Sequence, residues 1–367
     1  MAETRRRALI TGVAGQDGGY LAEHLLDRGY EVFGLALPGE EVAGGLDDGD
    51  HVLRGSLTDS ASLEAALRRS GPAEVYNLAA ATSVAASFLD PFAAAEVTGL
   101  GVLRLLEAVR RVDPTIRLLQ ATSSEIFAGA EVSPQDERTP LSPRSPYGVA
   151  KAFAHQMMSV YRESHGLFAA TAILYNHESP RRGLNFVTRK VTDAAARISL
   201  GLQEELRLGN LEVSRDWGYA PDYVRAMRLI LADDVADDFV VATGEMHSLR
   251  ELLDIAFSAA GLDWRRHVVS DPDLFRPVEP VHLCGDASKA RSHLGWAPSR
   301  AFDEVIREMV AADLDRLKGA APPPPARPGP AGPPASLPRP GGYDAGSSAT
   351  ARRAGPPPDP DAPHGKR

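Results

Sequence analysis

The segment T-G-V-A-G-Q-D-G at residues 11–18 constrains the fold more than any other part of the chain. It follows a short apolar run and precedes a helical pattern, so a strand, a tight turn and a helix are expected in that order. Gly12, Gly15 and Gly18 have G-x-x-G-x-x-G spacing, which lets the backbone bring a pyrophosphate against the N-terminus of the helix. The sequence therefore predicts a dinucleotide-binding loop, with contacts from Gly12, Gly15, Gln16, Asp17 and Gly18.

Short apolar runs alternate with helical patterns through the first half of the chain. The apolar residues of these runs are consecutive, as in strands buried on both faces, and the runs cover residues 7–11, 30–36, 73–80, 116–123 and 168–175. Helical spacing of leucines lies between them, at residues 20–28, 60–70 and 101–111. Strands and helices in this order predict an α/β fold with a doubly wound parallel sheet of the Rossmann type.

The second half of the chain has a more mixed pattern. Helices are predicted at residues 187–201 and 222–232, a strand at 239–244, and a turn-rich stretch at 208–218. Ser248 and Glu251 have capping-box spacing, which predicts a helix start.

These patterns predict two folded domains and a tail. We expect residues 1–175 to form the dinucleotide-binding domain, with segments near 215–245 returning to it, and residues 176–318 to form a smaller mixed α/β substrate-binding domain. Residues 319–367 are rich in Pro, Gly and Ala and are expected to be disordered, because they cannot bury a core.

Composition excludes several classes of partner. A net charge of -9 argues against nucleic acid, whose phosphates require a basic surface. No apolar run is long enough for a bilayer span, so no membrane partner is expected. The single Cys284 excludes an internal disulfide, and no Cys or His cluster accompanies it, so no metal site is expected. A cytoplasmic location fits these features best.

The segment S-P-Y-G-V-A-K at residues 145–151 carries a candidate proton-transfer group. Ser145 is a suitable helix cap, and Pro146 fits the first helical turn. Tyr147 and Lys151 are four residues apart and share a helix face, so we expect the ammonium charge to lower the pKa of the phenol. The alternative is a surface aromatic beside a lysine, and the spacing alone does not decide between them.

Longer segments make the chain resemble GDP-mannose 4,6-dehydratases, which are extended short-chain dehydrogenases/reductases. The glycine loop, the S-S-E segment after the fourth long apolar run, and the Tyr-Lys pair are features of the superfamily. Four segments narrow the resemblance to the dehydratases, and it extends from about Arg7 to Leu317; the segments are residues 175–190, 208–224, 241–248 and 275–279.

The resemblance implies conversion of GDP-mannose to GDP-4-keto-6-deoxymannose, by internal hydride transfer from carbon 4 to carbon 6 with loss of water. In this family pattern Tyr147, with Lys151, takes the proton of the 4-hydroxyl, while Ser123 hydrogen-bonds the 4-oxygen. Glu125 removes the carbon 5 proton, and Glu125 or Ser124 assists the departure of water.

The resemblance also implies a substrate site and a cofactor. The residues that match the family's sugar-nucleotide site are Asn176, Lys190, Arg215, Arg276 and Glu279. His177, within the same segment, is interpreted as a structural histidine. The family uses NADP, whereas the absence of an arginine after the second strand, together with Glu40 and Glu41, favours NAD by charge. A homodimer is expected, and a tetramer is not.

Two other functions remain open from the sequence. A sugar-nucleotide 4-epimerase or 4-reductase would use the same Tyr-Lys pair but would not need Glu125 to remove a carbon 5 proton. A non-catalytic dinucleotide sensor would use the Pro-rich tail to recruit partners, and would need none of the catalytic groups.

Overall fold

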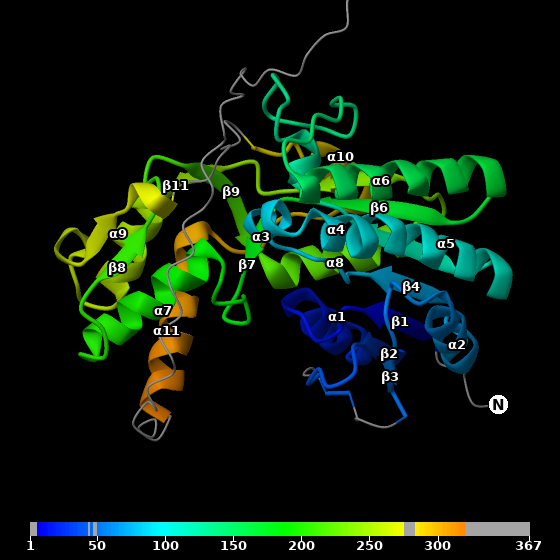
Figure 1. Cartoon of the computed structure of the whole chain (residues 1–367), viewed down its shortest axis with the longest axis horizontal. Coiled ribbons are helices and arrows are strands. Elements are labelled where there is room, and N and C mark those ends of the chain that lie inside the picture. Colours follow the sequence, from blue (N-terminus) through cyan, green and yellow to red (C-terminus); the bar gives the residue numbers. More distant parts are fainter. Residues whose placement is uncertain (1–5, 43–44, 47–49, 275–282, 320–367) are drawn as a thin grey trace, which may run out of the picture. The chain divides into compact units, whose positions relative to one another are not determined.

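The computed structural model describes residues 6–42, 45–46, 50–274 and 283–319 (Figure 1). The tail predicted for residues 319–367 lies outside this part of the chain, except for Gly319. Within the described residues, no helix is both long and apolar enough to cross a membrane.

The predicted parallel sheet is confirmed, and it has seven strands in the order β10-β6-β5-β4-β1-β2-β3. Every neighbouring pair is parallel, so all the strands end at one edge of the sheet. The strands are β1 (Arg7–Thr11), β2 (Glu31–Ala36), β3 (Val52–Arg54), β4 (Glu74–Asn77), β5 (Arg117–Ala121), β6 (Ala169–Leu174) and β10 (Asp238–Val241).

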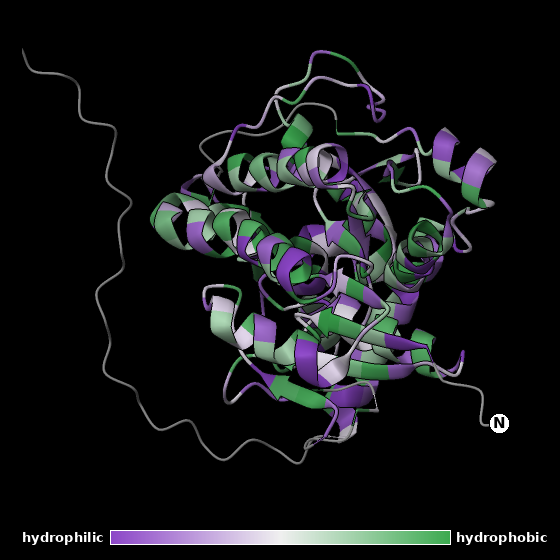
Figure 2. Ribbon diagram, turned by 90° about the vertical axis from the view of Figure 1, so that its right-hand side faces the viewer, coloured by the Kyte–Doolittle hydropathy of each residue, from purple (hydrophilic) through white to green (hydrophobic). Residues whose placement is uncertain are grey.

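Helices cover both faces of this sheet, as a doubly wound fold requires. One face packs against α1 (Gln16–Leu26), α8 (Ala220–Ala232) and α10 (Ser288–Leu294). The other packs against α2 (Ser60–Ser70), α5 (Gly101–Val112) and α6 (Pro146–His165). Strands carry mostly hydrophobic residues while the helices mix both kinds (Figure 2), because only one side of each helix is buried.

A second group of elements has its own core and lies on the left of Figure 1. Its helices are α7 (Val187–Ser199), α9 (Leu249–Ala259) and α11 (Phe302–Gly319), and its strands are β7 (Asn176–Glu178), β8 (Leu206–Leu208), β9 (Ser214–Tyr219), β11 (Met246–Ser248) and β12 (Val268–Ser270). A buried ion pair between Arg189 and Asp313 joins α7 to α11. The division of the chain at residue 175 stays a prediction.

The structure corrects one expected element. Residues 208–218 were expected to be turn-rich, but Ser214–Tyr219 form strand β9 between β7 and β11. The strand contains the charged residues Arg215 and Asp216, so it does not form the apolar run by which the other strands were predicted. Both side chains are nevertheless buried, and Asp216 accepts hydrogen bonds from the amide N–H groups of Thr243, Gly244 and Gly285. The predicted cap at Ser248 is confirmed, because its hydroxyl accepts from the Glu251 N–H.

Short elements connect the sheet to the helices. Two helices and a π-helical stretch precede α5, namely α3 (Val84–Leu89), α4 (Pro91–Ala93) and η1 (Ala94–Leu100). Three 3-10 turns are η2 (Ser124–Phe127), η3 (Trp264–Arg266) and η4 (Pro272–Leu274). The loop before α6 reaches the edge strand β10, where the Glu137 carboxylate accepts a hydrogen bond from the Val240 N–H at 2.8 Å.

Candidate active site

A cavity of about 390 Å³ lies at the carboxyl ends of β1, β4, β5 and β6, where ligands bind in open α/β sheets. It collects most of the polar residues that the sequence predicted to be functional. Those lining it are Asp17, Ser123, Glu125, Tyr147, Lys151, Asn176, Lys190 and Arg215. Ser124 does not line it and is buried, so its expected assistance to water loss has no support in this geometry. Arg276 and Glu279 lie outside the described residues.

Glu125 and Tyr147 reach the same cavity because their two segments come very close together. Glu125 lies on η2, directly after β5, and Tyr147 lies in the first turn of α6. A Cβ atom added to Gly148 would lie 2.8 Å from the carbonyl oxygen of Glu125, so only glycine permits this approach. The Ser145 hydroxyl caps α6 by accepting from the Gly148 N–H, as predicted.

The immediate partners of Tyr147 differ from those expected. Its hydroxyl hydrogen-bonds that of Ser123, whereas the Lys151 ammonium donates to the carbonyl of Ala121 at 2.7 Å. Burial raises the pKa of Tyr147, and the hydrogen bond to Ser123 opposes this only in part. The prediction of a lowered phenol pKa is therefore wrong for this arrangement. Burial lowers the pKa of Lys151 to about 8, because the charged ammonium is removed from water.

The glycine loop fits a dinucleotide. Gly12 has φ +67°, and a Cβ atom there would lie 2.8 Å from the Ala79 Cα. A Cβ atom on Gly18 would lie 2.4 Å from the Gly12 carbonyl oxygen, so the turn packs against the start of α1 without room for a side chain. Gly15 is the cap of α1 and has no side chain to occupy the N–H groups of the first turn. These groups can therefore hold a pyrophosphate.

Gln16 and Asp17 connect this loop to the segment that follows β6. The Asp17 carboxylate is 2.8 Å from the His177 Nε2, and the Ser179 hydroxyl donates to the Gln16 amide oxygen at 2.7 Å. The His177 Nδ1 lies 2.7 Å from the carbonyl oxygen of Tyr175, so both ring nitrogens have partners, consistent with its interpretation as a structural histidine. Of these residues, Asp17, Tyr175 and His177 also line the cavity.

Asp17 and His177 each stabilise the charged form of the other. Burial alone would raise the pKa of Asp17, but the charge and hydrogen bond of His177 outweigh it, and the pKa of Asp17 is lowered. Burial alone would lower the pKa of His177, but the charge and hydrogen bond of Asp17 raise it above its ordinary value. The pair is therefore an ion pair over a wider pH range than two isolated groups would allow.

The cavity contains polar residues that the sequence did not single out for this site. Arg182 and Arg207 add positive charge, Asn185 and Asn210 add amide groups, and Glu178 adds a buried carboxyl group. By sequence, Arg181 and Arg182 are two further basic residues that could bind the sugar nucleotide or bridge subunits. A single charged or polar residue carries no sequence signal that separates a cavity position from a solvated surface. These residues could therefore be assigned to the cavity only from the fold.

We expect the Asp17–His177 pair to make the stability of the protein depend on pH. The contribution of His177 to the free energy of unfolding is fully present below about pH 6.5 and is lost as the pH rises through its raised pKa. The contribution of Asp17 is present above about pH 4 and is lost as the pH falls through its lowered pKa. Urea unfolding should therefore show a larger destabilisation by Asp17→Asn at about pH 5.5 than at about pH 9. The exposed Asp234→Asn is the control, and an equal effect of Asp17→Asn at both pH values would contradict the expectation.

Comparison with known proteins places the chain in a family. The family model described as GDP-mannose 4,6 dehydratase matches residues 9–309. GDP-mannose 4,6 dehydratase 1 of Arabidopsis thaliana is 48% identical over 334 residues, covering 87% of this chain and 92% of the relative. GDP-mannose 4,6 dehydratase of Homo sapiens is 42% identical over 349 residues, covering 87% and 94%.

A solved structure agrees with the fold. The UDP-glucose 4-epimerase of Thermus thermophilus, in complex with NAD, has a TM-score of 0.75 and 32% identity, covering 86% of this chain and all of that one. The chain belongs to the GDP-mannose 4,6-dehydratase family.

Proposed function

We propose that this site dehydrates GDP-mannose to GDP-4-keto-6-deoxymannose, with Glu125 as the base that removes the carbon 5 proton. The observation that carries the proposal is that Glu125, Tyr147, Ser123 and Lys151 line one cavity. Family membership supports the reaction, a hydro-lyase reaction with internal hydride transfer from carbon 4 to carbon 6. A 4-epimerase or a non-catalytic sensor would leave the carboxyl group of Glu125 without a task in this cavity.

The chain's own residues move the protons of this reaction. A bound nicotinamide supplies hydride acceptance at carbon 4 and hydride return at carbon 6. The Tyr147 phenolate takes the proton of the 4-hydroxyl, and the Ser123 hydroxyl, already hydrogen-bonded to the phenol, orients the 4-oxygen. The 4-ketone acidifies the carbon 5 proton, which the Glu125 carboxylate removes. The resulting acid on Glu125 then protonates the 6-hydroxyl as it departs as water. The proton that Tyr147 took from the 4-hydroxyl returns to carbon 5, which completes the 6-deoxy product and restores the phenolate.

Stabilising the Tyr147 phenolate is the main electrostatic demand on the site, because burial disfavours the charged form. The positive charge of Arg182 lowers the pKa of Tyr147, and Lys151 is one helical turn away on the same helix. The negative charges of Glu125 and Asp17 act in the opposite direction. We assign Lys151 to stabilising the phenolate during proton transfer, once its ammonium leaves the Ala121 carbonyl.

The remaining cations of the cavity fit the diphosphate of the substrate. Lys190, Arg207 and Arg215 line the same cavity, and Asn176 adds a neutral amide donor. Their positive charge is local, because the whole chain carries a net charge of -9. We assign the sugar-nucleotide diphosphate to this side of the cavity.

NAD is the cofactor that the charges at the end of β2 favour. The Glu40 carboxylate accepts a hydrogen bond from the Leu37 N–H at 2.9 Å, which places negative charge directly after the strand. Arg54 donates to the carbonyl oxygens of Leu37 and Glu40, at 3.1 and 2.8 Å. An acid at this position suits the ribose hydroxyls of NAD and repels the 2′-phosphate of NADP.

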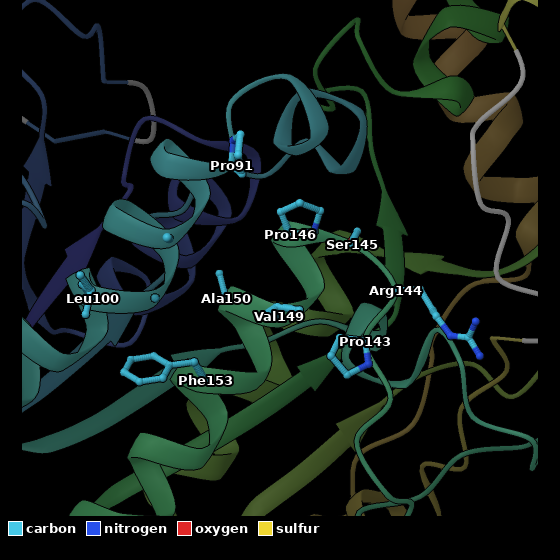
Figure 3. Close-up of a pocket in the computed structure, with 11 residues that line it drawn as sticks. Pro91, Leu100, Pro143, Arg144, Ser145, Pro146, Val149, Ala150 and Phe153 are labelled. Atoms are coloured by element: carbon cyan, nitrogen blue, oxygen red, sulfur yellow. The ribbon is translucent and has the colours of Figure 1, made fainter. Parts of the chain in front are cut away.

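A mostly apolar helical face supports the expected homodimer. A cavity of about 640 Å³ opens between η1 and α6, lined mostly by apolar residues including Leu100, Val149 and Phe153 (Figure 3). Arg144 is the charged residue of this lining. On the neighbouring helices α3 and α4, Leu89 is 74% exposed and Phe92 is 81% exposed. Two copies with a net charge of -9 each repel one another, so a face with few charges is where they can associate. We propose that a second copy covers this face.

Glu125→Gln tests the reaction. The wild-type protein incubated with GDP-mannose and cofactor should form a product lighter by one water, detected by mass spectrometry. Glu125→Gln should slow product formation by about 100-fold or more, because the amide cannot remove a proton, while reduction of the nicotinamide still occurs. Glu131→Gln, an exposed change nearby, should behave as wild type. Unchanged water loss in Glu125→Gln would refute the proposed role.

Cofactor choice is tested by binding measurements with NAD and NADP. We expect NAD to bind at least about tenfold more tightly, since a charged 2′-phosphate meets Glu40. Glu40→Arg should shift the preference toward NADP. A wild-type protein that binds NADP more tightly would contradict the assignment.

The dimer is tested with a matched pair of valine substitutions. Val149 and Val235 are both exposed, but only Val149 lies in the apolar cavity of Figure 3. Sedimentation velocity should find dimers for the wild type and for Val235→Asp, and monomers for Val149→Asp. A monomeric wild type, or a Val149→Asp variant that assembles like the wild type, would exclude this face.

A further inference from the structure

Glu178 is a buried carboxyl group in the cavity that the proposed mechanism does not use. It is 2% exposed and lies at the end of β7, two residues after Asn176. The groups that act on it are Arg182, Thr188, His177 and Asp17. A carboxyl group in such a position must have protein partners that compensate the loss of water.

Its two contacts both come from the segment that follows β7. The Thr188 hydroxyl donates to the Glu178 Oε2 at 2.5 Å, and the Arg182 Nε lies 3.3 Å from the same oxygen. The Arg182 guanidinium is itself held by stacking on Phe186, with its Cζ 3.6 Å from the ring centroid. Burial raises the pKa of Glu178, and the charge of Arg182 and the Thr188 hydrogen bond both oppose this shift.

This contact reaches the first turn of α7. Its cap residue is Phe186, which has no side-chain oxygen to accept from the helix N–H groups. Thr188 lies in that first turn, and the Glu178 carboxylate bonded to it therefore adds negative charge near the positive end of the helix. Glu178 therefore links the end of β7 to the start of α7.

These two elements carry two of the assigned substrate ligands. Asn176 begins β7, and Lys190 lies one turn into α7, two residues beyond Thr188. We propose that Glu178 is a positioning residue, which fixes Asn176 and Lys190 at the separation that the diphosphate of the GDP-sugar requires. This inference rests on the proposed function. It differs from a catalytic role, because the contacts of Glu178 are with protein groups.

Three variants separate the hydrogen bond from the charge. Thr188→Val removes the hydroxyl at nearly constant shape, and Thr188→Ser restores it. Glu178→Gln keeps an oxygen that accepts from Thr188 but removes the charge facing Arg182. We expect Thr188→Val and Glu178→Gln to raise the Kd for GDP and the KM for GDP-mannose by about fivefold or more, since each removes one compensating interaction. Thr188→Ser should match the wild type.

Measuring kcat, KM and the Kd values separately distinguishes a positioning role of Glu178 from a role in the reaction. In Thr188→Val, kcat and the Kd for the dinucleotide should stay within about twofold of wild type, since the base, the charge facing Arg182 and the phosphate loop are untouched. A fall in kcat at constant KM in Glu178→Gln, with Thr188→Val unaffected, would overturn the positioning role. Unchanged GDP affinity in Thr188→Val would do the same. A wild-type protein that binds GDP but forms no dehydrated product would instead refute the proposed function.

Discussion

The approach of α6 to the turn that carries Glu125 is the constraint on which the site depends. Gly148 lies against the Glu125 carbonyl at a distance that excludes any side chain, and this contact brings the carboxyl group and the Tyr147 phenol to one cavity. The sheet supplies the other condition, because parallel strands end together and present their following loops at one edge. The chemistry proposed here therefore follows from a backbone contact between two segments about twenty residues apart in sequence, and from strand order.

Sequence periodicity was sufficient for most strands of the sheet, though not for the short β3, and for most of the helices. Consecutive apolar residues mark strands buried on both faces, and all five of the predicted first-half runs contain strands of the sheet. Strand β9 was missed because it contains Arg215 and Asp216, and the partners of the Asp216 carboxylate, the N–H groups of Gly244 and Gly285, are far away in the chain. Local patterns cannot show such partners, and the fold alone brings them together.

Motifs located the candidate site, but not the interactions within it. The Tyr147 and Lys151 spacing placed both side chains at the cavity, yet the ammonium donates to the Ala121 carbonyl and burial dominates the phenol pKa. Glu178 was not singled out, since a glutamate in a short polar segment gives no sign that it will be buried. Side-chain direction and desolvation depend on tertiary packing, which spacing does not encode.

The contact of Glu137 with Val240 has a consequence for how copies of this protein meet. Strand β10 borders the sheet, and an uncovered border strand offers N–H and C=O groups to any other extended chain. The Glu137 carboxylate already accepts the hydrogen bond of one of these N–H groups, that of Val240. The loop that carries Glu137 would have to be displaced before another strand could pair there. Sheet extension at this border is thereby discouraged, which lowers the tendency of copies to form edge-to-edge aggregates through β10.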